Sequence, residues 1–277
     1  MRIALCNEVL AGRDFAAQCA YAAALGYDGL EVAPFTLAEE PTQLGASERA
    51  AIRRAAADAG IAITGLHWLL VKPPGLSITA SDAAVRARTR DTMRALVGLC
   101  ADLGGRYLVH GSPAQRRIPP DASRDDAWAR AREAFAAAAE AARAAGVLYL
   151  VEPLPRDETD LINTLGEAVT MVREIGLPAL KTMLDTKSAA LSEDEPVAAV
   201  AARWLPTGVI GHVQLNDRNR RGPGQGSDAF APVLRALRDN GYDGDIAIEP
   251  FDYVPDGPGC AARAIGYVRG LLEALRA

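Results

Sequence analysis

The amino-acid sequence predicts an α/β protein that folds as a single (β/α)8 barrel across residues 1–277. Short apolar runs alternate along the chain with longer segments rich in Ala, Leu, Arg and Glu. This is the pattern of repeated strand and helix units around a parallel sheet. Eight such units in 277 residues leave about 35 residues for each unit, which is enough for one strand, one helix and their loops.

The same length would also suit two ordinary domains or a doubly wound sheet. No change of composition, Ser/Gly-rich linker or block of charge divides the sequence into two parts. The GxGxxG pattern of dinucleotide-binding doubly wound sheets does not follow the first expected strand. We therefore expect one domain over residues 1–277, with its first and last units closing a ring.

The eight expected strands are the short apolar runs, and polar residues gather at their carboxyl ends. The strands are expected at Ile3–Asn7, Gly29–Ala33, Ala62–His67, Tyr107–Gly111, Leu148–Glu152, Thr182–Asp185, Val209–Asn216 and Ile246–Glu249.

The segments between these runs combine helical apolar spacing with strong helix propensity. Glycine follows several of them, as at Gly26, Gly104 and Gly146, where a left-handed residue ends a helix before the next strand. The helices are expected at residues 13–25, 46–59, 82–103, 124–145, 165–175, 194–203, 228–239 and 260–275.

The composition disfavours several classes of protein. The net charge is −5, with 30 basic and 35 acidic residues, so a broad basic surface for nucleic acid is not expected. With 49% hydrophobic and 23% charged residues, the chain resembles ordinary folded proteins that bury a core without disulfides.

The cysteines and the N-terminus favour a cytoplasmic protein. No CxxC pair occurs, which argues against a structural zinc site and a disulfide framework. The first apolar run is too short for a signal peptide, and no stretch approaches 18 consecutive apolar residues, so we expect no membrane partner. The four cysteines stand singly, at Cys6, Cys19, Cys100 and Cys260.

Three carboxylates end the fifth, sixth and eighth expected strands, namely Glu152, Asp185 and Glu249. In a (β/α)8 barrel these strand ends meet at one face, which is where such barrels perform their chemistry. Buried carboxylates need partners, and a divalent cation such as Mn²⁺ or Mg²⁺ suits a set dominated by oxygen ligands. Alternatively, each carboxylate pairs with an arginine or caps the helix that follows it.

All three histidines lie at or near strand ends. We expect His67 and His110 either to contact the substrate or to fill the top of the barrel. His212 has the same strand parity as Gln214 but lies two residues deeper, so a supporting role is expected for it. Trp68 is expected to form an apolar wall of the pocket.

Two loops contain further charged residues. The segment 216–226 follows the seventh strand and combines glycines with three arginines, including Arg220. Such a loop can bind phosphate or sugar hydroxyls through backbone N–H groups and guanidinium groups, or it is a solvated surface turn. The stretch 153–158 is expected to place Arg156 and Glu158 over the mouth of the barrel.

The sequence resembles the xylose-isomerase-like barrel superfamily, in particular the sugar isomerase and epimerase branch that contains D-tagatose 3-epimerase and hydroxypyruvate isomerase. The resemblance covers essentially the whole chain. It depends on four motifs, which are VEPL at 151–154, LDT at 184–186, NRRGPGQG at 219–226 and IE at 248–249.

The resemblance implies roles for individual residues. Glu152 and Glu249 would bind the metal and act as the two proton-transfer bases, and Asp185 would be the third ligand. The family usually has a histidine ligand on strand 7, six residues before the loop arginine, and this position is Gln214 here. An amide oxygen binds transition metals more weakly than imidazole does, so we expect weaker binding of Mn²⁺ or Mg²⁺, or replacement of this ligand by His212. Co²⁺ and Zn²⁺ are softer alternatives.

The resemblance also implies substrate contacts by Glu158 and Arg220. Epimerases of the branch often have a histidine three residues after the strand-6 aspartate, where this sequence has Ser188, preceded by Lys187. We expect Ser188 to contact the substrate in its place.

The expected function is that of a metal-dependent isomerase or epimerase, which moves a proton next to a carbonyl group of a sugar, sugar acid or sugar phosphate. The expected partner is therefore a small carbohydrate, and a homodimer or homotetramer is the expected assembly. Two alternatives are a lyase or dehydratase of related chemistry and a carbohydrate-binding barrel that has lost its metal. An abasic-site endonuclease would need a multi-metal site rich in histidine, which three histidines do not provide.

Overall fold

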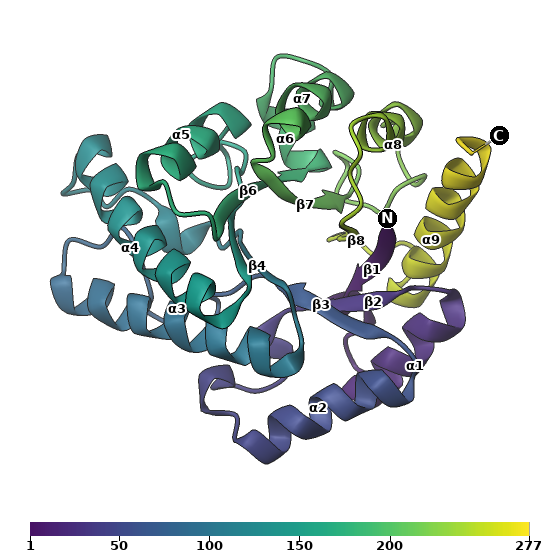
Figure 1. The fold of residues 1–277 in the computed structure, drawn as a ribbon, viewed down its shortest axis with the longest axis horizontal. Coiled ribbons are helices and arrows are strands. Elements are labelled where there is room, and N and C mark those ends of the chain that lie inside the picture. The colour runs from purple at the N-terminus through teal and green to yellow at the C-terminus, as the bar shows by residue number, and fades with distance from the viewer. Residues whose placement is uncertain (277) are drawn as a thin grey trace.

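The computed structural model describes residues 1–276 and shows a closed barrel of eight parallel strands, in the order β1 to β8 with β8 beside β1 (Figure 1). The predicted (β/α)8 barrel is therefore confirmed. The strands are β1 (Arg2–Cys6), β2 (Gly29–Val32), β3 (Ala62–Leu66), β4 (Tyr107–His110), β5 (Leu148–Val151), β6 (Leu180–Asp185), β7 (Ile210–Leu215) and β8 (Asp245–Ile248).

The helices surround the strands, and the last helix packs beside the first and closes the outer ring (Figure 1). Among residues 1–276, no helix has both the length and the apolar character that crossing a membrane requires. The α-helices are α1 (Phe15–Leu25), α2 (Ala46–Asp58), α3 (Ala83–Leu103), α4 (Arg124–Ala145), α5 (Leu165–Ile175), α6 (Thr186–Ser192), α7 (Val197–Trp204), α8 (Phe230–Asp239) and α9 (Gly257–Ala274).

The helix α6 was not predicted from the sequence. It has seven residues and starts directly after β6, so it is too short to show a helical apolar period. Its N-cap is Asp185, whose Oδ1 accepts a hydrogen bond of 2.6 Å from the backbone N–H of Ser188. One predicted metal ligand therefore also starts a helix.

The pairing of β6 with β7 sets which polar residues meet at the carboxyl end of the barrel. Thr182 lies opposite Ile210 and Leu184 lies opposite Val213, so β7 contains one extra residue at this point. Beyond this irregularity Gln214 lies directly opposite Asp185.

His110 lies on the outer side of β4, toward the helices. Its Nδ1 is 2.8 Å from the hydroxyl oxygen of Tyr149, and its ring meets the ring of Phe135 in α4 edge to face at 4.9 Å. Alternate residues of a strand face opposite sides of the sheet, and Val109 belongs to the cluster of strand residues that packs inside the barrel. This placement gives no support to the predicted contact between His110 and the substrate.

The environment of His110 predicts a loss of stability in acid. Burial lowers the pKa of the imidazole to about 3, and the nearby positive charge of Arg116 lowers it further in the same direction. The unfolded chain takes up this proton below about pH 6.5, whereas the folded protein does not. The free energy of unfolding therefore falls as the pH falls from about 6.5 toward 3.

We expect the wild-type protein to lose about 2 kcal/mol of unfolding free energy through this group between pH 7 and pH 5. The variant His110→Phe should show a smaller loss over the same interval, whatever its absolute stability. Urea unfolding at both pH values measures the difference. Equal losses in the two proteins would show that His110 is protonated in the folded state.

Candidate active site

A cavity of about 270 Å³ opens at the carboxyl end of the barrel. Its walls come from the segments that follow β3 to β8, so the cavity lies where barrels of this type bind substrates. It is lined by Trp68, Gly111, Pro113, Arg117, Glu152, Leu154, Glu158, Lys187, Arg220, Glu249 and Phe251.

Three carboxylates converge beside this cavity. Glu152, Asp185 and Glu249 are all buried, and each has a carboxylate oxygen within 4.8 Å of an oxygen of the other two. Burial raises the pKa of Glu152, and the charges of Glu249 and Asp185 raise it further. Burial also raises the pKa of Glu249 to about 8, although the hydrogen bond from His67 acts in the opposite direction. A cation would relieve this repulsion.

The absence of a side chain at Gly111 leaves the space that the Glu152 carboxylate occupies. A Cβ atom at residue 111 would lie 1.7 Å from Oε2 of Glu152, so no larger residue fits while that carboxylate stays where it is. From the other side, Nη1 of the fully buried Arg116 donates a 2.5 Å hydrogen bond to the main-chain oxygen of Glu152. The carboxylate therefore points toward the cavity from a backbone that is held in position.

Gln214 and Asp185 each have an oxygen atom without a partner. Gln214 is fully buried, and its Nε2 donates a 2.5 Å hydrogen bond to Oε1 of Glu31. Within residues 1–276, neither Oε1 of Gln214 nor Oδ2 of Asp185 accepts a hydrogen bond. Buried oxygens without partners are costly, and these two belong to residues that face each other across β6 and β7. The pair therefore suits a hard cation that binds oxygen ligands.

Glu31, on β2, is the acceptor that orients Gln214. Its Oε2 lies 2.6 Å from the hydroxyl of Tyr107 and 2.7 Å from Nε2 of His212. Burial would raise the pKa of Glu31, but the nearby His212, His67 and the Tyr107 hydroxyl together lower it to about 2. The ring of His212 stacks on Tyr107 at 4.1 Å. This placement fits the supporting role predicted for His212 rather than a role as a metal ligand.

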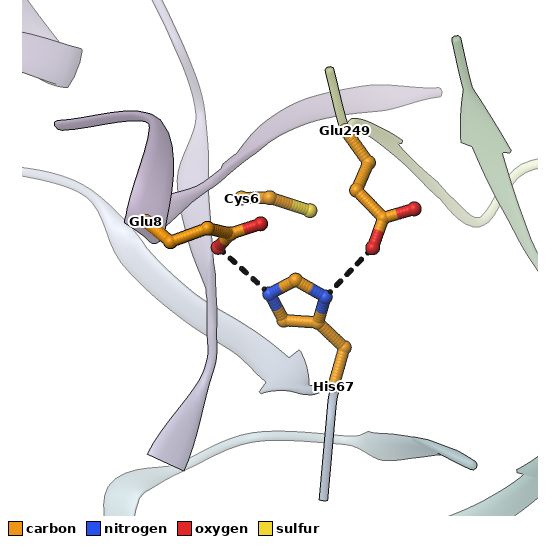
Figure 2. A group of neighbouring side chains, drawn as sticks. All are labelled: Cys6, Glu8, His67 and Glu249. Carbon is orange, nitrogen blue, oxygen red and sulfur yellow. Dashed lines mark hydrogen bonds and ion pairs between the residues drawn. The ribbon is translucent and has the colours of Figure 1, made fainter. Parts of the chain in front are cut away.

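His67 joins two carboxylates, as Figure 2 shows. Its Nδ1 lies 3.0 Å from Oε1 of Glu249, and its Nε2 lies 3.0 Å from Oε2 of Glu8, beside the thiol of Cys6. Burial would lower the pKa of His67, but Glu8 and Glu249 raise it well above its ordinary value. The ring is fully buried and does not line the cavity, so it holds Glu249 rather than meeting the space for substrate.

A partly buried ion pair also lines the cavity. Nζ of Lys187 lies 2.5 Å from Oε1 of Glu158 and 5.0 Å from the ring centre of Phe251. The Arg220 guanidinium lies 5.5 Å from the centre of the same ring. The main-chain oxygen of Arg220 accepts hydrogen bonds from Phe251 and Asp252, which ties the loop after β7 to the segment after β8. The residues Glu158 and Arg220 thus reach the cavity as expected.

Ser188 does not reach the cavity. It is buried in the first turn of α6, and its hydroxyl has no partner among the described residues. The neighbouring Lys187 occupies the wall instead, and sequence reasoning did not assign it a role. Arg117 and Phe251 were also missed, because neither ends an apolar run. The only signal for them was their position shortly after the fourth and eighth strands.

Comparison with known proteins identifies relatives of this chain. Residues 19–271 match the family model of the xylose isomerase-like TIM barrel. The chain is 32% identical over 234 residues to a D-psicose 3-epimerase of Agrobacterium fabrum, which covers 83% of this chain and 76% of the relative. It is 30% identical over 244 residues to a putative hydroxypyruvate isomerase of Streptomyces coelicolor, which covers 83% of each chain.

Solved structures show the same fold. A D-psicose 3-epimerase crystallised in the presence of D-fructose superposes with a TM-score of 0.84 at 24% identity, over 98% of this chain and 99% of that one. A 3-keto-D-glucoside 4-epimerase from E. coli superposes with a TM-score of 0.83 at 20% identity, over the same shares. Together with the match over residues 19–271, these relatives show that the chain belongs to the xylose isomerase-like TIM barrel family and is homologous to its sugar epimerases and isomerases.

Proposed function

We propose that this protein is a divalent-metal-dependent isomerase or epimerase of a sugar, sugar acid or sugar phosphate. The observation behind this proposal is the convergence of Glu152, Asp185 and Glu249 beside the cavity at the carboxyl end of the barrel. Homology to a D-psicose 3-epimerase and a putative hydroxypyruvate isomerase supports a carbohydrate substrate and proton transfer next to its carbonyl group. No feature of the site favours an elimination reaction or a metal-free binding barrel.

Glu152, Asp185, Gln214 and Glu249 would hold the cation. The unpartnered oxygens of Asp185 and Gln214 support this set, as does the repulsion among the three carboxylates. Because all four ligands are oxygen atoms, we propose Mn²⁺ or Mg²⁺ in preference to Co²⁺ or Zn²⁺. A bound divalent cation supplies polarisation of the substrate carbonyl, which makes the neighbouring C–H group more acidic.

Glu152 and Glu249 would be the proton-transfer groups, and both line the cavity. One carboxylate removes the proton next to the carbonyl, which leaves an enediolate. Return of a proton to the same carbon from the opposite side gives the epimer, whereas return to the neighbouring carbon exchanges aldose and ketose. His67 fixes the direction of the Glu249 carboxylate, and Gly111 leaves the space that Glu152 occupies.

The substrate would lie between this acidic cluster and the wall formed by Glu158, Lys187 and Arg220. Trp68 and Phe251 provide apolar surfaces, with ring centres 6.1 Å apart. Glu158 and Arg220 can contact hydroxyl or anionic groups of the substrate. Because His67, His110 and Ser188 do not line the cavity, we assign them no direct contact.

Replacing either proton-transfer group should abolish turnover. We expect Glu152→Gln and Glu249→Gln each to lower kcat by about 10³-fold, since general acid–base catalysis contributes about 10² to 10⁴. NMR of Mn²⁺-supplemented reactions in D₂O, over a panel of keto-sugars, aldo-sugars, sugar acids and sugar phosphates, measures new isomers and deuterium uptake. Circular dichroism confirms that each variant is folded. Undiminished activity in both variants would refute the two-base mechanism.

Removal of divalent metal should stop the reaction and destabilise the fold. Dialysis against a chelator should abolish activity, and Mn²⁺ should restore it. Metal at about 100 times its Kd should raise the free energy of unfolding by about 2.7 kcal/mol over the metal-free protein. The variant Asp185→Asn is the matched control and should respond more weakly. A purified protein that neither retains nor responds to divalent metal rules out this enzyme.

Gln214 offers a direct test of the ligand set. We expect Gln214→His to bind Mn²⁺ more tightly, because imidazole is the stronger ligand for a transition metal and its second N–H group can still donate to Glu31. Gln214→Leu should bind more weakly, by roughly 10-fold to 100-fold. Titration followed by electron paramagnetic resonance measures free Mn²⁺ in each protein. If both variants bind like the wild type, water or another side chain provides the fourth ligand.

A further inference from the structure

The cavity lining contains equal numbers of acidic and basic side chains. Three carboxylates line it, Glu152, Glu158 and Glu249, and the cations Arg117, Lys187 and Arg220 line it as well. Glu152 and Glu249 belong to the acidic cluster, whose partner is the proposed metal ion. Glu158 has its own partner in Lys187, at 2.5 Å.

Arg117 and Arg220 remain without a carboxylate partner in the described part of the chain. Among residues 1–276, the only hydrogen bond from the Arg117 side chain goes to the main-chain oxygen of Glu158, at 2.7 Å. The Arg220 guanidinium lies over Phe251 and forms no ion pair with any of residues 1–276. Both residues are exposed, and both line the cavity.

These cations form one continuous wall. Arg117 contacts Glu158, Glu158 contacts Lys187, and both Lys187 and Arg220 lie over the ring of Phe251. The wall therefore offers guanidinium and ammonium donors, while its single carboxylate is already occupied by Lys187. Neutral sugar hydroxyls require acceptors as well as donors, whereas a carboxylate or phosphate accepts hydrogen bonds at every oxygen.

We propose that the substrate of this site has a carboxylate or phosphate group, which Arg117 and Arg220 bind. Guanidinium groups match the geometry of both anions through pairs of parallel hydrogen bonds. The inference rests on the proposed function for the presence of a metal ion at the acidic cluster. It narrows the substrate from sugars in general to sugar acids or sugar phosphates.

The test measures binding separately from turnover. Trp68 lines the cavity, so its fluorescence reports occupancy, and Trp128→Phe with Trp204→Phe leaves it as the single tryptophan of the three in the chain. The Mg²⁺-loaded protein is titrated at constant ionic strength with D-fructose, D-fructuronate and D-fructose 6-phosphate. These ligands share one ketohexose skeleton and have a hydroxyl, a carboxylate or a phosphate at carbon 6.

We expect at least one anionic ligand to bind at least tenfold more tightly than D-fructose, and the tighter of the two identifies the group as carboxylate or phosphate. Arg117→Met should weaken that binding at least tenfold and change the affinity for D-fructose far less. Arg156→Met is the matched control, because it removes the same charge from an exposed residue outside the cavity and should change neither affinity. Equal or weaker binding of both anions, or an equal effect of the two arginine variants, overturns the proposal.

This design separates the two proposals. Preferential binding of an anion without conversion of any sugar in the Mn²⁺ assay contradicts the proposed reaction and leaves the anion site standing. Metal-dependent conversion of sugars, together with equal binding of the three ligands, contradicts the anion site and leaves the reaction standing.

Discussion

The burial of three carboxylates at one end of the barrel is the constraint on which the rest of the site depends. Like charges within 4.8 Å of one another in a buried site repel strongly and raise one another's pKa. Neighbouring residues donate hydrogen bonds to these carboxylates or to their backbone. His67 donates to Glu249, the main chain of Ser188 donates to Asp185, and Arg116 holds the backbone of Glu152. None of these contacts neutralises the cluster fully, which leaves the centre suited to a divalent cation.

The same constraint explains how a glutamine can serve at the position where the family resemblance implies a histidine. A glutamine amide can rotate to present either oxygen or nitrogen, and only the oxygen can bind a cation. Glu31 removes this ambiguity because it accepts a hydrogen bond from Nε2 of Gln214 and leaves Oε1 as the free end. Glu31 in turn keeps its charge within the barrel because His212 and Tyr107 bind its other oxygen. The buried network around Glu31 thus determines that Oε1 of Gln214, and not Nε2, is free to bind a cation.

Sequence reasoning located the fold and the acidic cluster because both follow from simple periodic rules. Parallel strands of one barrel end at one face, so Glu152, Asp185 and Glu249 could be placed together from their positions alone. It could not decide which side of the sheet the last residue of a strand faces. Alternation along β4 gives the side of His110 only once a neighbour is placed, and here Val109 lies inside the barrel and His110 faces α4. It also could not find pairs between residues that follow different strands, such as Lys187 with Glu158 or Arg117 with the backbone of Glu158. Such pairs have no characteristic spacing in sequence.

The acidic and the basic residues of the cavity are proposed to bind different parts of the substrate. The acidic cluster and its proposed cation act on the carbonyl and the neighbouring carbon, which are common to many sugars. The basic part of the lining differs from a simple hydroxyl-binding surface because Lys187 occupies the acceptor Glu158 and two further guanidinium groups line the same space. Under the two proposals, the strand ends set the reaction, whereas residues that follow β4, β6 and β7 set the charge of the substrate. A homologue with the same acidic cluster and an uncharged lining at these positions would then share the proposed chemistry but not the proposed substrate.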